Sequence, residues 1–407
     1  MTHLPPSQIA IIGGTLIDQP GDLLIYGDRI GATGGFEIPA EAAVIDAKGL
    51  IVLPGLIDIG AQTVEIAACA AGGITRVAPM PDGGTPLDSP GLVQRAALAA
   101  KPHLWVHPLA AATKALEGRE LAEYALMARA GAKAVATGRR WIGDSSVMRR
   151  VLQYAGSLGL TVISHAEDDG LTAGAVATAG ETATRHGLPA APAIAEALAI
   201  ARDLLLVEET GAKLHFDQVT TARGLALVRE AKARGLPVTC GITPAHLLLS
   251  DIAMSDFRTF ARLCPPLRSE DDRQACLAAM ADGTIDVLSS GHDPRGSEVK
   301  RLPFADADAG ASGAETLLAL ALGLVRDGVI SMGRLAALTS ANPARLLGID
   351  AGHLGAGSPA DLTLVDPNSF WIVDGAKFRA SAGNTPFQGL PVQGRAVRTI
   401  KGGRTIS

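Results

Sequence analysis

Three short segments of this chain carry the side chains best suited to acid–base or metal chemistry. They hold His165, His246, and the adjacent pair His292 and Asp293. Imidazole changes its charge near neutral pH, and imidazole and carboxylate groups are common ligands of transition-metal ions. Each segment directly follows a short apolar run, which indicates that these side chains lie where buried strands end.

The elements that must position these side chains alternate between strand and helix. Eight short apolar runs are candidate strands: residues 56–60, 74–80, 103–109, 132–137, 161–165, 213–219, 237–242 and 285–290. Segments with helical periodicity follow them, among them residues 146–158, 194–209, 222–234 and 271–281. Repeated units of this size predict a (β/α)8 barrel, in which polar residues at the carboxyl ends of the strands form a cleft. An open sheet is the alternative, because periodicity does not reveal closure.

The two ends of the chain differ from the middle in their sequence pattern. Residues 9–52 and 360–403 contain short β-prone pieces separated by Gly and Asp turns, and neither end has enough strands for a stable sheet alone. We therefore expect an α/β protein with two domains. Residues 53–355 form the barrel, and residues 1–52 plus 356–407 form one small β-sandwich domain.

Composition excludes several classes of protein. The 407 residues carry a net charge of −5, are 47% hydrophobic, and contain no Lys/Arg run that would bind nucleic acid or an anionic membrane. Neither a signal-peptide pattern nor a membrane-spanning apolar run is present. The four cysteines show no CxxC spacing, which suits free thiols in a reducing compartment. We expect a cytoplasmic protein.

Several motifs together resemble one family. Residues 53–58 read Leu-Pro-Gly-Leu-Ile-Asp, 165–168 read His-Ala-Glu-Asp, 243–247 read Thr-Pro-Ala-His-Leu, 264–268 read Cys-Pro-Pro-Leu-Arg, and 384–389 read Asn-Thr-Pro-Phe-Gln-Gly. This set is similar to the amidohydrolase superfamily, specifically dihydroorotases of the class I type, over nearly the whole chain. The resemblance implies a barrel, a binuclear zinc site at the strand ends, and hydrolysis of a cyclic amide.

The chain departs from the family at the positions that would hold the metal. Of the ligands that the resemblance implies, only His165 is present. The other positions hold Gly60, Gln62, Thr137, Gln218 and Gly291, the last where the family has its catalytic aspartate. Val64 replaces the arginine that grips the substrate, and Cys264 replaces an asparagine. One imidazole does not hold zinc, which takes about three protein ligands in catalytic sites. We therefore expect no catalytic residue, no metal and no other cofactor.

The resemblance and its departures favour a non-catalytic dihydroorotase homologue. Such a protein would be a structural or regulatory partner of the aspartate carbamoyltransferase catalytic chain in pyrimidine biosynthesis, within a homo- or hetero-oligomer. A residual cleft is expected at Asp58, Gly60, Gln62, Thr137, His165, Gln218, His246, Cys264, Arg268, Gly291, His292 and Asp293.

The alternative is an active, metal-dependent cyclic amidohydrolase. It would hydrolyse dihydroorotate to carbamoyl aspartate with a rearranged or mononuclear zinc site. One such arrangement would use His165, His246, His292 and Asp293, although ligand geometry is strict. Arg139 and Arg140 are expected to be a solvated pair on a loop, with anion binding in the cleft as the alternative.

Overall fold

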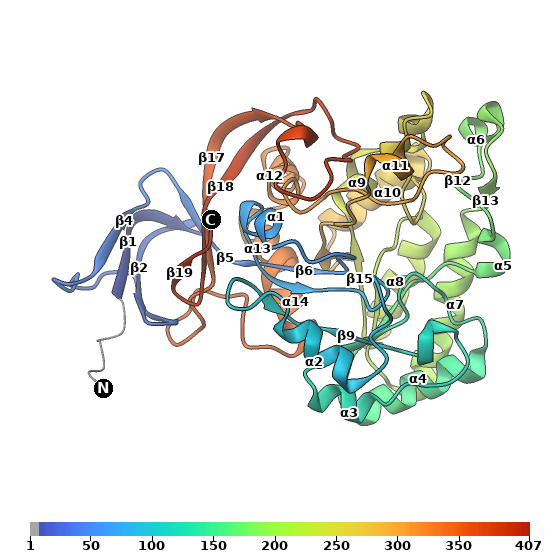
Figure 1. Ribbon diagram of the computed structural model, residues 1–407, viewed down its shortest axis with the longest axis horizontal. Helices are drawn as coiled ribbons and strands as arrows, with labels where there is room; N and C mark the ends of the chain where they lie inside the picture. The colour runs from blue at the N-terminus through green and yellow to red at the C-terminus, as the bar shows by residue number, and fades with distance from the viewer. Residues whose placement is uncertain (1–7) are drawn as a thin grey trace.

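The computed structural model describes residues 8–407 and divides into a barrel and a smaller sheet domain (Figure 1). The barrel strands are β6 (Leu56–Ile59), β7 (Ile74–Ala78), β8 (Trp105–Val106), β9 (Leu109–Ala111), β10 (Ala134–Ala136), β11 (Val162–Ser164), β14 (Leu214–Phe216), β15 (Val238–Ile242) and β16 (Val287–Leu288). Seven of the eight expected runs contain one of these strands each, and the third run contains β8 and the first residue of β9. The (β/α)8 fold is confirmed.

Hydrogen bonds outside the ladders help to close the barrel. Strands β6, β7 and β8 pair in parallel, and β9, β10, β11, β14, β15 and β16 form a second parallel ladder. Between β8 and β9 the chain continues the third strand, and His107 N donates to Val77 O at 2.8 Å. On the other side, the Asp58 carboxylate accepts from Ser290 N at 2.8 Å and from its hydroxyl at 2.5 Å.

The barrel interior is filled by small and branched apolar side chains, as a chain with 3% aromatic residues requires. Ile57, Ile59, Leu109 and Ile163 meet there, and Leu347 from the C-terminal part of the chain packs against them. A second, larger cluster lies between the strands and the surrounding helices. The rigid strand ends above this packing are where side chains can be held in fixed positions.

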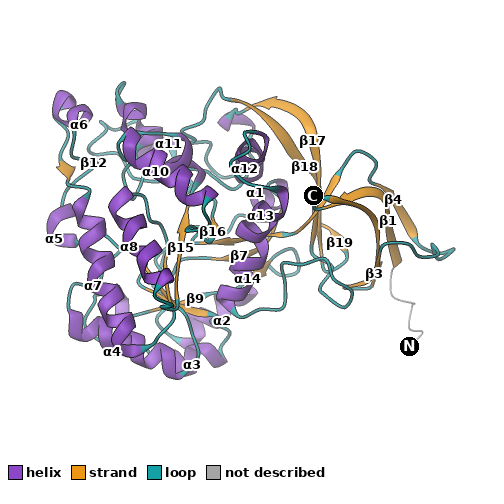
Figure 2. Cartoon of the chain, turned by 180° about the vertical axis from the view of Figure 1, so that it is seen from behind, coloured by secondary structure: helices purple, strands orange, loops and turns teal. Residues whose placement is uncertain are grey.

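Helices surround the barrel, and several of them begin at residues whose side chains cap free N–H groups (Figure 2). Asp144 caps α4 by accepting from Ser146 N and Val147 N, and Ser269 caps α10 by accepting from Asp272 N. The longer helices are α2 (Pro90–Leu98), α4 (Ser145–Ser157), α7 (Ile194–Thr210), α8 (Ala222–Ala233), α10 (Glu270–Ala281) and α12 (Leu317–Arg326).

Shorter elements fill the connections. The short helices are α1 (Ile66–Ala71), η1 (Lys114–Leu116), α3 (Tyr124–Arg129), α5 (Asp169–Thr172), α6 (Glu181–His186), α9 (Pro244–Leu248), η2 (Asp251–Met254), η3 (Thr259–Ala261), α11 (Ser297–Lys300), α13 (Met332–Ala336), η4 (Ala337–Ala341), α14 (Asn342–Leu347) and η5 (Gly375–Lys377). Strands β12 (Ala177–Thr178) and β13 (Ala190–Ala191) pair with each other.

Both ends of the chain contribute to the second domain, as expected. Within residues 8–407 its eight strands form one sheet: β1 (Gln8–Leu16), β2 (Gln19–Tyr26), β3 (Arg29–Thr33), β4 (Ala43–Asp46), β5 (Ile51–Pro54), β17 (Leu362–Ile372), β18 (Pro391–Lys401) and β19 (Arg404–Thr405). Strand β5 pairs with β17 in antiparallel fashion and so joins the N-terminal to the C-terminal part. Ile11, Leu23, Ile25, Leu362 and Ile400 form its core. The boundaries at residues 52/53 and 355/356 stay a prediction.

A buried ion pair ties the two domains together. Arg76 of β7 lies 2.5 Å from Asp361, just before β17, and both side chains are less than a tenth exposed. Trp105 and Lys401 stack beside this pair. No helix among residues 8–407 combines the length and the apolar character that crossing a membrane would take.

Candidate active site

A narrow cleft of about 50 Å³ opens at the carboxyl ends of the barrel strands. Its walls come from the residues that follow β6, β11, β14, β15 and β16, together with the loop that carries Cys264 and the segment at Phe387. Seven of the expected residues line it: Gly60, Gln62, His165, Gln218, His246, Cys264 and Gly291. A larger hollow of about 600 Å³ lies between α12 and the β17–β18 pair, away from the strand ends. The cleft is the candidate active site because titratable groups converge there.

The backbone at two of the expected ligand positions does not accept the residues of the two-metal set. Gly60 has φ +89° and Gly291 has φ +61°, in the left-handed region that residues with a Cβ rarely adopt. A Cβ on Gly60 would lie 2.7 Å from Asp217 Oδ1, and one on Gly291 would lie 2.9 Å from the Thr243 methyl group. The binuclear zinc site implied by the resemblance therefore does not fit these residues.

Three other donors gather at the edge of the cleft. Each of three residues offers one possible ligand atom: a ring nitrogen of His165, a carboxylate oxygen of Glu167 and the sulfur of Cys264. These three atoms lie within 4.8 Å of one another. His165 Nε2 lies 3.5 Å from Glu167 Oε2. His165 follows β11, Glu167 stands two residues later, and Cys264 comes from a distant loop. Together they form a group that could hold one metal ion.

Charge is shared within this group. Burial by itself lowers the pKa of His165, but the hydrogen bonds and charges of Cys264 and Glu167 outweigh it and raise the pKa well above its ordinary value. Burial raises the pKa of Cys264, but the hydrogen bond and the charge of His165 lower it by more than burial raises it. The net shift of the Cys264 pKa is therefore downward. For Glu167, burial is outweighed by His165 and Arg268, which lower its pKa to about 2. The group therefore favours a thiolate and a carboxylate.

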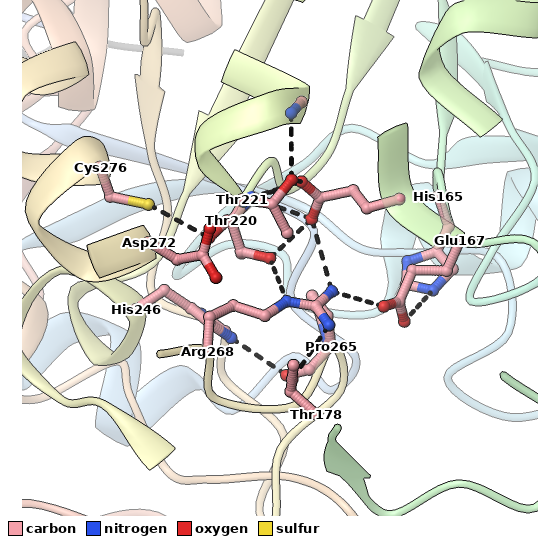
Figure 3. A network of polar contacts seen from close by, with 12 residues as sticks. His165, Glu167, Thr178, Thr220, Thr221, His246, Pro265, Arg268, Asp272 and Cys276 are labelled. Carbon is pink, nitrogen blue, oxygen red and sulfur yellow. Dashed lines mark hydrogen bonds and ion pairs between the residues drawn. The ribbon is translucent and has the colours of Figure 1, made fainter. Parts of the chain in front are cut away.

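Arg268 fixes the position of Glu167 from behind (Figure 3). Its Nη2 lies 2.5 Å from Glu167 Oε1 and 3.5 Å from Glu196 Oε2, and its Nε donates to Thr220 Oγ1 at 2.9 Å. Glu196 also accepts bonds from the backbone and hydroxyl groups of Thr220 and Thr221 at the start of α8. One oxygen of Glu167 is thus anchored, while the other faces His165.

Arg139 provides a cation in the cleft. Its Nη2 donates to Asp293 Oδ2 at 2.6 Å, and its backbone N–H donates to Asp82 Oδ2 at 2.8 Å. With the Gln62 amide oriented to satisfy its neighbours, the oxygen of Gln62 accepts from Arg139 Nε and its nitrogen donates to Asp82, each at 3.2 Å. The side chain is 27% exposed and lines the cleft. The expectation of a solvated pair is wrong for Arg139, because the distant carboxylates draw it inward.

Asp217 is the carboxylic acid that faces the cleft directly. It follows β14, and among residues 8–407 no donor is hydrogen bonded to its carboxyl group. Burial raises its pKa to about 7, although the positive charges of His165 and Arg139 oppose this rise. A carboxyl group with this pKa is present in both its acid and its base form near neutral pH, as proton transfer requires.

Five of the expected residues lie behind the cleft rather than on its wall. Thr137 Oγ1 accepts from His165 N at 3.0 Å, Asp58 holds Ser290, and Arg268 holds Glu167. His292 Nε2 lies 3.1 Å from Glu65, and Asp293 is bonded to Arg139. They are buried supports of the site.

The alternative cluster of three histidines and Asp293 does not assemble. His246 uses Nδ1 in a 2.8 Å bond with Thr243 Oγ1 and Nε2 in a 3.0 Å bond with Pro265 O. The His292 nitrogens are bonded to Glu65 and to Ala314 N. Their positions are occupied by hydrogen bonds within the fold, so they are structural rather than metal-binding residues.

Sequence reasoning missed Asp217 and Glu167 as members of the site, and it placed Arg139 in the cleft only as the alternative to a solvated pair. A signal existed for two of them, because Glu167 belongs to the recognised His-Ala-Glu-Asp motif and Asp217 stands at the end of an expected strand. For Arg139 the sequence does not decide between solvent and cleft, since the direction of its side chain depends on Asp82 and Asp293.

Solved structures share this fold over almost the whole chain. The L-hydantoinase (dihydropyrimidinase) of Arthrobacter aurescens superimposes with a TM-score of 0.85 at 25% identity, covering 98% of this chain and 95% of that one. The dihydropyrimidinase of Brevibacillus agri NCHU1002 has a TM-score of 0.84 at 23% identity, with 98% and 94% covered. These structures support the barrel with its attached sheet domain.

Curated relatives give a finer comparison. The dihydroorotase of Syntrophus aciditrophicus is 37% identical over 98% of this chain and 99% of its own length. The dihydroorotase of Pelotomaculum thermopropionicum is 39% identical over 98% of both chains. The dihydroorotase of Anaeromyxobacter dehalogenans is 39% identical over 96% of this chain and 93% of its own.

These relatives contradict the expectation of a non-catalytic pseudoenzyme and favour the alternative, an active hydrolase. That expectation rested only on the missing ligands of the binuclear zinc site. Loss of that set leaves the cleft and a different group of donors in place. The model of the Amidohydrolase family matches residues 63–406. The chain therefore belongs to the amidohydrolase family, and the three relatives described above, which match it over almost their full length, are dihydroorotases.

Proposed function

We propose that this chain is a dihydroorotase-type hydrolase, which opens the cyclic amide of dihydroorotate to give carbamoyl aspartate. The observation that supports it most strongly is the identity of 37–39% to dihydroorotases over almost the whole chain. The cleft at the strand ends supports it too, because barrel enzymes carry their chemistry there. The two-metal set does not fit the residues present, so the roles below belong to the chain's own side chains.

Arg139 is the substrate anchor in this proposal. Dihydroorotate and its product both carry carboxylates, and a guanidinium N–H donates a charge-assisted hydrogen bond to a carboxylate. Arg139 lines the cleft, and Val64 stands where the resemblance implies the family's arginine. Its contacts with Gln62 and Asp293 use Nε and Nη2. Within residues 8–407 no hydrogen bond from Nη1 is found, so Nη1 is assigned the bond to substrate.

Asp217 is the proton-transfer residue. Hydrolysis adds water to the ring carbonyl, which releases a proton, and the ring nitrogen takes up a proton as the C–N bond breaks. A carboxyl group whose pKa is raised to about 7 accepts the first proton and returns the second. It stands in the cleft wall next to Gly60, and no hydrogen bond to its oxygens is found within residues 8–407.

The test is turnover by the purified protein in both directions. The chain should be produced in a host that lacks its own dihydroorotase, so that no host enzyme contributes. Ring opening is followed by the loss of dihydroorotate absorbance, and ring closure by the consumption of carbamoyl aspartate. The Asp217→Asn protein, purified identically, is the control. Equal rates for both proteins, or no turnover with or without added divalent metal, would refute the proposal.

Association with the aspartate carbamoyltransferase catalytic chain, and the formation of an oligomer, stay predictions. Co-expression followed by size-exclusion chromatography with light scattering tests both. A transferase whose mass is the same with and without this chain, at micromolar concentration, would contradict the first.

A further inference from the structure

Two of the three donors at the cleft edge, Glu167 and Cys264, are not among the metal ligands that the resemblance implies, and only His165 is shared with that set. His165 and Glu167 come from the segment after β11, and Cys264 comes from the loop between η3 and α10. A bound metal ion takes the place of the His165 proton, so the group then consists of one neutral imidazole, one carboxylate and one thiolate, with a combined charge of −2. This charge balances that of a divalent cation, and nitrogen, oxygen and sulfur are all zinc donors.

Their spacing is close to that of a tetrahedral ion. With bonds of about 2.0–2.3 Å to each donor, two ligand atoms of tetrahedral zinc lie roughly 3.3–3.7 Å apart. His165 Nε2 and Glu167 Oε2 already lie 3.5 Å apart. All separations within the group are below 4.8 Å, so an ion would draw the sulfur inward by about 1 Å or less.

The surroundings hold two of the donors in orientation. The backbone N–H of His165 is bonded to Thr137 Oγ1, and Glu167 is bound through its second oxygen by Arg268. Thr178 and Thr220 in turn accept from Arg268 at 3.1 and 2.9 Å. Figure 3 shows this chain of contacts ending at the His165 ring. Partners of this kind orient metal ligands and raise metal affinity.

One coordination position is left to the cleft. His165 and Glu167 are buried, whereas Cys264 is only partly so and lines the cavity together with His165. Three protein ligands with an open fourth position are typical of catalytic zinc, and four protein ligands of structural zinc.

We propose that His165, Glu167 and Cys264 bind one divalent transition-metal ion, with zinc the best match, and leave its fourth position open to the cleft. This site is mononuclear and uses a thiolate. It concerns ion binding, so it stands or falls independently of the proposed hydrolysis.

Cobalt substitution tests the site without measuring activity. The protein is stripped with chelator and titrated with Co²⁺, and visible and near-ultraviolet spectra are recorded. We expect one ion per chain, the strong visible bands of tetrahedral cobalt, and a thiolate-to-cobalt charge-transfer band. Cys264→Ser should abolish the charge-transfer band and weaken binding at least about 10-fold. Cys240→Ser is the matched control, because Cys240 is a buried thiol outside the cleft, and should leave the spectrum unchanged.

A measurement on the unmodified chain covers the case in which Cys264→Ser does not fold. Cys264 is partly exposed, and the other three thiols are buried, so a thiol reagent should modify Cys264 first in the native protein. Zinc at one equivalent should slow that modification at least tenfold. Binding of less than one ion per chain at micromolar zinc and cobalt, an unchanged charge-transfer band in Cys264→Ser, or modification that zinc does not slow would each overturn the proposal.

Discussion

Replacement of Arg268 by methionine should destabilise the barrel strongly, because it removes the cation between two buried carboxylates. The side chains of Arg268, Glu167 and Glu196 are 3%, 8% and 0% exposed. Removing one partner of a buried ion pair typically costs about 3–5 kcal/mol, since the charge left behind is neither solvated nor paired. Glu196 keeps its bonds from Thr220 and Thr221, so most of the cost falls on Glu167. We expect a loss of about 3 kcal/mol in the free energy of unfolding, the lower end of that range.

Equilibrium urea denaturation, followed by circular dichroism, measures the loss. The matched control is Arg149→Met, which breaks a bidentate pair with Glu209 whose two side chains are 46% and 47% exposed. Exposed pairs contribute about 1 kcal/mol or less. Adding Glu167→Gln to Arg268→Met should recover part of the loss, because it removes the unpaired charge. A loss no larger than that of the control, or no recovery in the double variant, would refute this account of the network.

Three further predictions concern the cleft and the effect of pH. Asp217→Asn should lower kcat at least about 100-fold and remove the rise in activity with pH that the ionisation of Asp217 near pH 7 produces in the native enzyme, as a pH–rate profile would show. Arg139→Gln should raise KM more than it lowers kcat, as expected for a residue that binds a carboxylate in both ground and transition states. His215 is buried, which lowers its pKa to about 3, so only the unfolded chain takes up its proton near pH 6.5. Its contribution to stability is therefore complete from about pH 7.5 upward and falls by about 1.4 kcal/mol between pH 7.5 and 5.5. Urea titrations should find this fall missing in His215→Gln.

Each of these predictions has a control in the chain. Arg140→Gln changes the exposed neighbour of Arg139 and should leave KM unchanged. His353→Gln removes an exposed histidine and should keep the acid-induced loss of stability. A pH–rate profile of Asp217→Asn that keeps the limb near pH 7 would contradict the role of that carboxyl group. An equal rise in KM for both arginine variants would exclude Arg139 as the anchor.

The barrel was predictable because its strands and helices follow from local sequence patterns, namely short apolar runs and helical periodicity. The helix expected at residues 194–209 is found as α7 (Ile194–Thr210), and the strand expected at residues 237–242 is found as β15 (Val238–Ile242). The alternation of short apolar runs with segments of helical periodicity also predicts the number of consecutive strand–helix units. These elements depend on interactions between residues close in the sequence, which is why the sequence pattern predicts them correctly.

The site was less predictable because its members meet through the tertiary fold. Cys264 reaches His165 and Glu167 from a loop almost one hundred positions later, and no local pattern announces that contact. Comparison with the family motifs tests only whether the ligands of the binuclear zinc site are present, and of these it identifies His165 alone. It could not reveal that the backbone at Gly60 had taken a left-handed conformation, or that Asp217 had filled the space beside it.

The pairing of β5 with β17 bears on how this protein is made. Residues 51–54 are synthesised before the entire barrel, and their partners at residues 362–365 are synthesised after it. During translation the first strands must therefore wait, with one edge unpaired, while the barrel emerges from the ribosome. Unpaired strand edges attract other chains, and such non-local pairings form slowly. The nascent chain is most exposed to aggregation in this interval, and the sheet is completed only when the last strands leave the exit tunnel.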